Sequence, residues 1–288
     1  MLLVTYEAAG QQRPGAVVDH EVVDLGGVAH DMLALIDLGS AGLEQAQAAV
    51  QARAKVLPLA DVVLQAPIPR PRQNIVCLGM NYAEHAYESN RSKGLPPSLP
   101  PHPVFFTKAT TTVNRPDGII PLNHGLTSQL DWEVELAFVI GRTGKDIPKA
   151  EALSYIFGYT IINDISARDL QSQHQQFFKG KSLDGSCPMG PWIVTADELP
   201  NASDLALKLR VNGTLMQDSR SSDLIFDIPT CLATLSQGQT VQAGDIVSTG
   251  TPSGVGMAHT PPISLQAGDV VEAEIERIGV LRNTVGQP

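Results

Sequence analysis

The chain has 288 residues, of which 43% are hydrophobic, and it carries a formal net charge of −10. This length and composition are typical of a globular protein with one large domain, or with a large and a small one. The negative charge argues against nucleic acid or an anionic membrane as the main partner. A small acidic substrate is still compatible with it, because a bound cation or a few arginines can reverse the local field.

The sequence predicts a cytoplasmic protein. Its three cysteines have no CxxC or CxxH spacing, so neither a disulfide framework nor a zinc site is expected. The first residues lack a basic segment followed by a long apolar one, which a secretion signal requires. We find no apolar stretch of about 20 residues, and therefore predict no membrane-spanning helix.

Residues 1–66 have the pattern of a small α+β domain. Short strands between Gly and Asp turns are predicted at residues 2–6, 16–18 and 22–25. The segment 29–54 is rich in Ala, Leu and Gln and predicts one or two helices, interrupted between Gly39 and Gly42. A stiff connector follows at 67–71, since each of its prolines fixes φ and restricts the residue before it.

Residues 67–288 are predicted to form a strand-rich catalytic domain. Residues 89–103 are polar and then proline-rich without hydrophobic periodicity, and we predict that they form a mobile lid. Strands are expected at 74–79, 132–140, 159–162, 206–211, 245–249 and 269–278, and helices at 81–88, 150–157, 167–175 and 226–235. This irregular order predicts an α+β fold rather than a βαβ alternation.

Three acidic residues stand on apolar strands of this domain. Glu133 and Glu135 are two residues apart, so a strand points both side chains to one face. Asp164 ends a second apolar run, where a buried strand would leave the core. Crowded carboxylates repel one another and are costly to desolvate, and an oxygen-bound divalent cation relieves both costs. The alternative is the solvated face of an edge strand, although Ala137 and Val139 on the same side disfavour it.

A histidine and a carboxylate are spaced for contact just before the predicted lid. On a helix, His85 and Glu88 are neighbours at i and i+3, and a carboxylate orients an imidazole and raises its basicity. Such a pair can activate water as a general base once a lid closes. The same spacing is also common on solvated helix faces, which is the alternative interpretation.

Arg168 and Gln171 follow Asp164 closely in the sequence. If a helix begins near Ser166, these three side chains lie on one side of it. The arginine could then hold Asp164 or a substrate carboxylate through two parallel hydrogen bonds. The alternative is a surface ion pair between Arg168 and Asp169.

Two candidates lie on turn-rich segments. Lys181 could stabilise the charge of a developing enolate, or it could only solubilise a loop. Thr251 lies in a Gly-rich turn that matches neither a phosphate-binding loop nor a nucleophile elbow. Its hydroxyl and the neighbouring amides could bind a carboxylate, or the segment could be a plain hairpin turn.

Taken in order, these segments resemble the fumarylacetoacetate hydrolase family from about Asn74 to Val285. The resemblance is carried by Gly79 to Glu88, Pro103 to Lys108, Glu133-x-Glu135, Asn163 to Asp169, Lys181-Ser182, Ser186 to Pro188, Val211 to Gly213, Asp245 to Gly256, and Gly268-Asp269. It departs from the family pattern at Ala109, where a proline usually follows the lysine. Residues 1–66 follow no pattern with a functional interpretation.

The resemblance implies a mixed β-roll or β-sandwich catalytic domain that is commonly a homodimer and binds Mg²⁺ or Mn²⁺, with Ca²⁺ as a further option. It also implies a role for each candidate residue. The metal ligands would be Glu133, Glu135 and Asp164, the catalytic residues His85, Glu88 and Lys181, and the substrate-binding residues Arg168, Gln171 and Thr251.

The same resemblance implies a small keto acid as the substrate and a metal-stabilised enolate in the reaction. Our first hypothesis is hydrolysis of a carbon–carbon bond in an acylpyruvate-type substrate, as in the catabolism of aromatic compounds. The alternatives on the same residues are decarboxylation of oxaloacetate and keto–enol isomerisation or hydration of a related dienoate. A non-catalytic binding protein is a further alternative, which the intact set of candidate residues disfavours.

Overall fold

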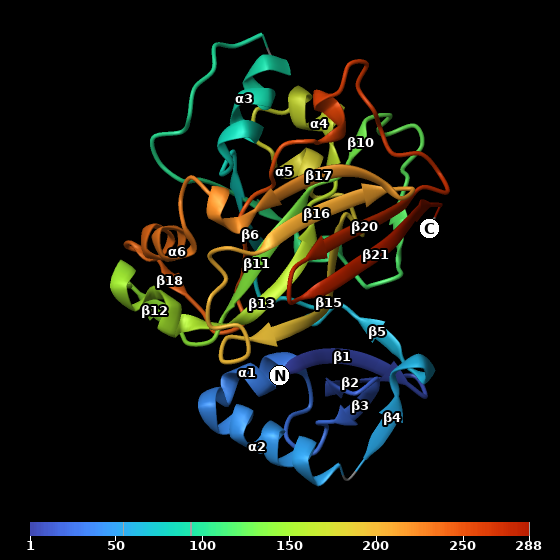
Figure 1. The fold of residues 1–288 in the computed structure, drawn as a ribbon, viewed down its shortest axis with the longest axis vertical. Helices are drawn as coiled ribbons and strands as arrows, with labels where there is room; N and C mark the ends of the chain where they lie inside the picture. The colour runs from blue at the N-terminus through green and yellow to red at the C-terminus, as the bar shows by residue number, and fades with distance from the viewer. Residues whose placement is uncertain (54, 93, 288) are drawn as a thin grey trace.

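The computed structural model describes residues 1–53, 55–92 and 94–287, and within them strands dominate over helices (Figure 1). The largest sheet has 12 strands. Along its main path the order is β4 (Val56–Pro58), β3 (Glu21–Asp24), β2 (Gln11–Val18), β1 (Leu2–Ala8), β15 (Cys187–Thr195), β13 (Ile156–Asn163), β11 (Val134–Ile140), β19 (Ile246–Ser248), β6 (Ile75–Gly79) and β7 (Val104–Lys108). In addition, β5 (Val63–Gln65) pairs with β1, and β8 (Val113–Asn114) pairs with β15.

A second sheet and a few short helices complete the described part of the chain. The second sheet has the order β17 (Thr214–Arg220), β16 (Ala206–Val211), β20 (Val270–Ile275), β21 (Gly279–Gly286) and β9 (Ile119–Pro121). Two-stranded pairs join β10 (Leu130–Asp131) to β14 (Ser166–Ala167) and β12 (Gly144–Lys145) to β18 (Thr240–Val241). The α-helices are α1 (Met32–Asp37), α2 (Gly39–Ala52), α3 (Ala83–Ser92), α4 (Arg168–Gln173), α5 (Phe178–Lys181) and α6 (Ile228–Ser236), and 3₁₀ helices span Leu59–Asp61, Thr110–Thr112, Lys149–Tyr155, Ser221–Asp223 and Gly256–Ala258.

Strand β11 lies at the centre of this arrangement. On one face, Leu136 and Phe138 belong to the core between the two large sheets. On the other face, Ala137 and Val139 belong to a second core that includes residues of α1. Because both faces are covered, every residue of β11 is buried, which explains its almost continuous apolar sequence.

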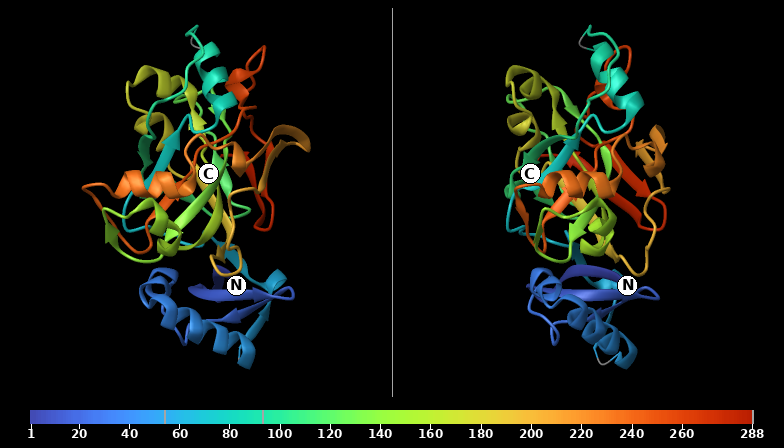
Figure 2. Two further views of the ribbon diagram at one scale, coloured as in Figure 1. Left: turned by 60° about the vertical axis from the view of Figure 1, so that its left-hand side comes forward. Right: turned by 90° about the vertical axis from the view of Figure 1, so that its left-hand side faces the viewer.

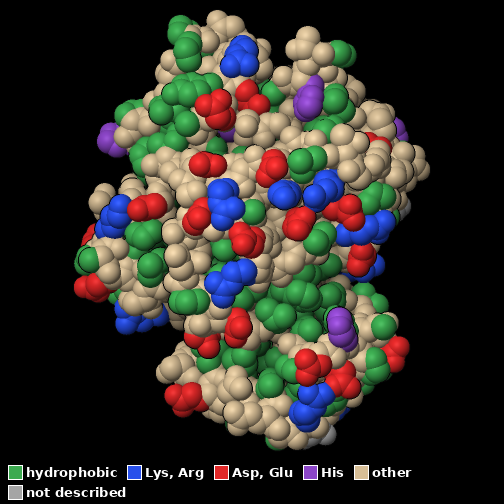
Figure 3. Space-filling model, viewed as in Figure 1, with side chains coloured by type: hydrophobic (Ala, Val, Ile, Leu, Met, Phe, Trp, Pro, Cys, Tyr) green, Lys and Arg blue, Asp and Glu red, His purple; other side chains and the backbone are tan. Residues whose placement is uncertain are grey.

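The outer face of the second sheet is exposed to solvent. Figure 3 shows basic and acidic side chains intermixed over this face of the molecule. Arg210 of β16 and Glu274 of β20 form an ion pair at 2.8 Å. The alternating burial of β16 and β20 follows from this one-sided covering. The two sheets therefore form a sandwich with a few helices, and the predicted α+β class and β-sandwich architecture are confirmed.

The N-terminal strands continue the large sheet, since Leu2 and Leu3 of β1 pair with Val194 and Ile193 of β15. In Figures 1 and 2 they form, with α1 and α2, a lobe at the end of the molecule opposite α3. The domain boundary at residue 66 stays a prediction.

Residues 94–103 follow α3 without regular structure. The Asn90 side chain ties this segment to the helix by donating to the Ser98 carbonyl at 3.0 Å. The role of this segment as a lid stays a prediction. None of the described helices is both long and apolar enough to cross a membrane.

Several predicted elements differ from the structure in type or bounds. The helix expected at 81–88 extends to Ser92, so the first residues of the predicted lid belong to α3. The helix expected at 150–157 is a 3₁₀ helix that ends at Tyr155, because Ile156 already pairs with Ile140 in the sheet. The strand expected at 132–140 begins only at Val134. The preceding N–H groups of Trp132 and Glu133 bond to the side chains of Asp131 and Asn163 instead of to a strand.

We predict that the sandwich depends on the apolar side chains of β11. Phe138 is fully buried, so Phe138→Ala should lower the free energy of unfolding by about 3–5 kcal/mol. Phe178→Ala is the matched control, because Phe178 is 45% exposed and its loss should change stability by about 0.5 kcal/mol or less. Urea unfolding of both variants measures the difference, and equal losses would contradict the central role of β11.

Candidate active site and metal centre

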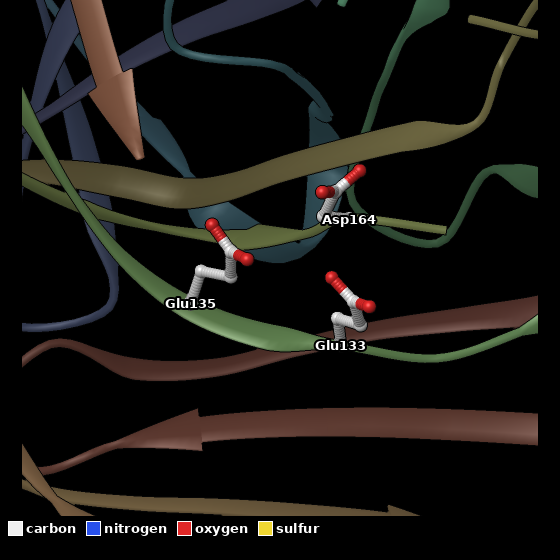
Figure 4. A group of neighbouring side chains, drawn as sticks. All are labelled: Glu133, Glu135 and Asp164. Carbon is white, nitrogen blue, oxygen red and sulfur yellow. The ribbon is translucent and has the colours of Figure 1, made fainter. Parts of the chain in front are cut away.

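Two neighbouring strands bring the three predicted acids together. Val134 lies opposite Asn163 in the antiparallel register of β11 and β13. One residue further, the Asp164 N–H donates to the Glu133 carbonyl oxygen at 2.9 Å. Glu135 lies two residues along the chain on the same side (Figure 4). One carboxylate oxygen of each acid lies within 4.8 Å of the others, and all three residues are buried.

Basic side chains neutralise Glu133 and Asp164. The Lys181 Nζ donates to Glu133 Oε2 at 2.6 Å and to Asp164 Oδ2 at 2.7 Å. The Arg168 Nη2 lies 2.7 Å from Glu133 Oε1, as an ion pair without good hydrogen-bond alignment. Although burial opposes the charge on Glu133, Lys181 and Arg168 lower its pKa to about 2.

Lys181 is a permanent cation at this place. Burial favours its neutral amine, but the carboxylates of Asp164 and Glu133 outweigh burial and raise its pKa. It therefore keeps its proton over the whole physiological range.

Glu135 has hydrogen-bond donors but, within the described residues, no cation at ion-pair distance. Its Oε2 accepts from the Ser248 hydroxyl at 2.5 Å and from the Gly250 N–H at 3.1 Å. Burial, followed by the charges of Asp164 and Glu133, raises its pKa well above the ordinary value. Among the described residues, no basic side chain forms an ion pair with it. A buried carboxylate without a counter-charge is what a divalent cation would stabilise.

The donor set fits a hard cation. It consists of carboxylate oxygens only, and each oxygen that accepts one N–H keeps a lone pair for a metal. Glu133, Glu135 and Asp164 are therefore the residues that would hold Mg²⁺ or Mn²⁺. The choice between these metals stays a prediction.

Arg168 has different partners from those we expected. Its Nε donates to Asp131 Oδ2 at 2.8 Å, and the side chain is buried. The predicted pairing with Asp164 and the alternative pairing with Asp169 are both wrong. Asp169 instead accepts hydrogen bonds from the loop before β10. Asp131 is within reach because it pairs with Ser166 across β10 and β14, immediately before α4.

His85 and Glu88 lie in contact on α3. The His85 Nδ1 is 2.8 Å from Glu88 Oε1, and His85 is only 8% exposed, so the solvated-face interpretation is wrong. Because a carboxylate accepts hydrogen bonds, a neutral imidazole in this contact would carry its hydrogen on Nδ1 and leave the lone pair of Nε2 free. The other oxygen of Glu88 accepts from the Gly254 N–H at 3.1 Å. A catalytic role for this pair stays a prediction.

Gln171 and Thr251 both line the cavity described below. The Arg168 Nη1 donates to Gln171 Oε1 at 3.1 Å, which fixes the orientation of the amide. The Thr251 hydroxyl donates to the Val134 carbonyl at 3.0 Å and accepts from Gln217 at 2.8 Å. Gln171 is therefore the better placed of the two to donate to a substrate, since the hydroxyl hydrogen of Thr251 is already used.

Lys108 is a residue of the site for which we predicted no role. Its fully buried ammonium donates to the Asp164 Oδ1 at 2.7 Å, and further to the Ser186 hydroxyl and to the carbonyl oxygens of Ile165 and Lys181. It thus holds the oxygen of Asp164 that Lys181 does not contact. A lysine at the end of a strand normally extends to solvent, so its spacing gave no signal. The signal that could have identified Lys108 was its position in the segment Pro103 to Lys108, which resembles the family.

A cavity of ≈ 560 Å³ joins these groups. Its lining includes Glu133, Glu135, Lys181 and His85, together with hydroxyl and amide side chains such as Gln129. Phe106 and Phe177 add an apolar wall, with ring centroids 5.5 Å apart in an edge-to-face contact. The cavity therefore offers charge, hydrogen-bond donors and an imidazole to one small polar ligand.

We predict that Glu135 destabilises the metal-free fold as pH rises. Its folded-state pKa is raised, so ionisation above its unfolded pKa of about 4.3 favours the unfolded chain. In EDTA, Glu135→Gln should therefore gain stability over the unmodified protein progressively from pH 4.5 towards pH 8. Mn²⁺ should reverse this order, because the variant loses a metal ligand.

Thermal unfolding between pH 4 and pH 8, with and without Mn²⁺, measures both effects. Glu44→Gln on α2 is the control, since Glu44 is exposed and far along the chain from the acids. A stability difference for Glu135→Gln that does not grow with pH would contradict the buried, unpaired carboxylate.

Comparison with known proteins identifies the family. Residues 74–286 match the fumarylacetoacetate (FAA) hydrolase C-terminal family. Oxaloacetate tautomerase YisK of Bacillus subtilis is 50% identical over 228 residues, which cover 79% of this chain and 74% of that protein. Fumarylacetoacetate hydrolase from Exiguobacterium antarcticum has a TM-score of 0.84 at 38% identity, with 100% of both chains covered.

A third relative was solved with ligands. Maleylpyruvate hydrolase from Sphingobium sp. SYK-6, in complex with manganese(II) and pyruvate, has a TM-score of 0.81 at 30% identity and covers 100% of this chain and 99% of its own. The family match extends over well more than half of the sequence, and it agrees with the acids and the fold described above. This chain belongs to the fumarylacetoacetate hydrolase family of enzymes.

Proposed function

We propose that this protein is a divalent-metal-dependent oxaloacetate tautomerase, which interconverts the keto and enol forms of a four-carbon keto diacid. The observation that carries the proposal is the 50% identity with an oxaloacetate tautomerase over most of the chain. This proposal replaces carbon–carbon hydrolysis, our first hypothesis, by a keto–enol isomerisation, which we gave as an alternative for a related dienoate and not for oxaloacetate. Hydrolysis is the second candidate, because a maleylpyruvate hydrolase shares the fold at a TM-score of 0.81.

Tautomerisation transfers one proton from carbon to the carbonyl oxygen. It needs a base and a group that stabilises negative charge on oxygen, but no attacking water. His85 is the proposed base, because Glu88 holds its Nδ1–H and leaves the Nε2 lone pair to accept the proton. The imidazolium then returns this proton to the oxygen of the enolate, so the reaction is balanced. The Glu88 carboxylate stabilises the imidazolium between the two transfers.

The remaining site residues supply charge and orientation. Lys181 keeps its proton, so it can stabilise a developing enolate but does not act as a base. The Gln171 amide is held by Arg168 and lines the cavity, and in this proposal it would donate to a substrate carboxylate. A divalent cation held by the three acids would supply Lewis-acid polarisation of the carbonyl group. The related hydrolase that holds manganese and pyruvate supports Mn²⁺ and a 2-oxo acid as the occupants.

We predict that the purified protein with Mn²⁺ accelerates the equilibration of enol-oxaloacetate with its keto form. The loss of ultraviolet absorbance of the enol follows this reaction, and EDTA should abolish the acceleration. Acetylpyruvate and maleylpyruvate are assayed in parallel for release of pyruvate. Cleavage of these substrates without acceleration of tautomerisation would replace the proposal by the hydrolase, and release of carbon dioxide from oxaloacetate would replace it by the decarboxylase.

We also predict that His85→Gln lowers kcat by about 10²–10⁴-fold, because the variant removes the base and keeps a polar side chain of similar length. Binding of Mn²⁺, measured by calorimetry, should stay within about twofold, since no metal ligand is changed. His30→Gln is the control, because its side chain is 84% exposed. Full activity of His85→Gln would show that another group transfers the proton.

A further inference from the structure

The turn at residues 254–257 connects the histidine pair to the acid centre through its backbone. The Gly254 N–H donates to Glu88 Oε2 at 3.1 Å, which is the carboxylate oxygen that His85 does not contact. The Gly254 carbonyl oxygen accepts from the Trp132 Nε1 at 3.1 Å. Trp132 is fully buried and directly precedes Glu133. The two peptide groups that flank this glycine are therefore bonded to helix α3 on one side and, on the other, to Trp132 in the segment that precedes β11.

Asp131 holds the other end of the same turn. Its Oδ1 accepts from the Gly256 N–H at 2.6 Å, and its Oδ2 accepts from the Met257 N–H at 3.0 Å. The same Oδ2 accepts from Arg168 Nε at 2.8 Å, and Arg168 pairs with Glu133. Because Asp131 is 1% exposed, these bonds act in a medium of low dielectric constant and define the position of the turn sharply.

The turn has little freedom to move toward the second sheet. Gly254 has a φ of +99°, a conformation that L-residues with a side chain rarely adopt. A Cβ atom on this residue would lie 2.0 Å from the carbonyl oxygen of Met216 in β17. The backbone of the turn thus packs directly on the edge strand, and only glycine permits this approach.

We propose that Trp132 and Asp131 are positioning residues, which set the place of the His85–Glu88 pair over the acid centre by holding the 254–257 turn. The proposal rests on His85 as the base of the proposed function. Glu88 is bonded to the turn through a single N–H, so a displaced turn displaces Glu88 and with it the imidazole. A misplacement of about 1 Å can cost about a hundredfold in rate without any change in the reacting groups.

Trp132→Phe tests the proposal, since it removes the indole N–H and keeps an aromatic ring in the core. We expect kcat to fall at least about tenfold, while KM and the Kd for Mn²⁺ change by less than about twofold. Trp192→Phe is the matched control, because the Trp192 Nε1 likewise donates to a backbone carbonyl, at 2.6 Å, but to that of Ile278 and not to one in the 254–257 turn. This control loses the same kind of hydrogen bond and should retain full kcat. Equal kcat in both variants would overturn the proposal.

A double-mutant cycle asks whether Trp132 acts through Glu88. In the Glu88→Ala background, Trp132→Phe should lower kcat by less than about twofold further, because the link that it perturbs is already cut. If the two effects multiply, Trp132 acts by another route and the proposal is wrong.

A spectroscopic measurement separates this proposal from the proposed reaction. In protein labelled with ¹⁵N-histidine, the Nδ1–H signal of His85 is assigned by its loss in His85→Gln. Trp132→Phe should speed the exchange of this proton with water at least about tenfold, whichever substrate the enzyme uses. An unchanged exchange rate would overturn the positioning role, even if tautomerase activity is found.

Asp131→Asn tests the other end of the turn and serves where Trp132→Phe does not fold. It places an amide group among the N–H donors of Gly256, Met257 and Arg168, so at least one hydrogen bond to the turn is lost. We expect the same faster exchange of the His85 Nδ1–H and a lower kcat, with Mn²⁺ binding retained. Protection equal to that of the unmodified protein would contradict the proposal.

Discussion

The structure depends on the burial of four carboxylates against three cations at one end of β11 and β13. The acids are Asp131, Glu133, Glu135 and Asp164, and the bases are Lys108, Arg168 and Lys181. Removing an ion from water costs several kcal/mol, and this cost is recovered only when partners are close and well oriented. The chain brings the seven residues from β7, β10, β11, α4, α5 and the segments that flank them. The sandwich and its short helices therefore have to form together for the cluster to be neutralised.

The charges within this cluster are distributed unequally, and this is what makes it a site. Glu133 has two cationic partners and a lowered pKa, whereas Glu135 has a raised pKa and no ion-pair partner in the part of the chain that the structure describes. A fully paired cluster would be a structural ion network with no affinity for a further cation. Glu135 lies beside two acids that already have their ion pairs. Its carboxylate therefore attracts a further cation to one point of the cavity wall.

The sequence allowed prediction of what depends on local periodicity. Two-residue spacing placed Glu133 and Glu135 on one face, and helical spacing placed His85 beside Glu88. Local periodicity does not predict contacts between segments that are distant in the sequence. The predicted partner of Arg168 was wrong because helical spacing relates this residue only to others on its own helix. Asp131 lies near Arg168 because β10 pairs with β14. Lys108 had no local signal, since nothing in a strand sequence indicates that its last lysine meets a buried aspartate. The helix expected at 150–157 ended early because sheet pairing of Ile156 outweighed local propensity.

The choice between tautomerisation and hydrolysis is a question of distance rather than of residue type. In the proposed function and in its hydrolytic alternative, both reactions would use an imidazole oriented by a carboxylate and an enolate stabilised by charge. A base in direct contact with the substrate carbon removes its proton, whereas a base separated from the substrate by one water, about 3 Å further away, activates that water instead. The distance from His85 to the acid centre is not set by α3 alone, since Glu88 is anchored to the turn that Trp132 and Asp131 hold. Trp132 and Asp131, which we propose as positioning residues, are thus in a position to influence which of the two reactions the proposed catalytic groups perform.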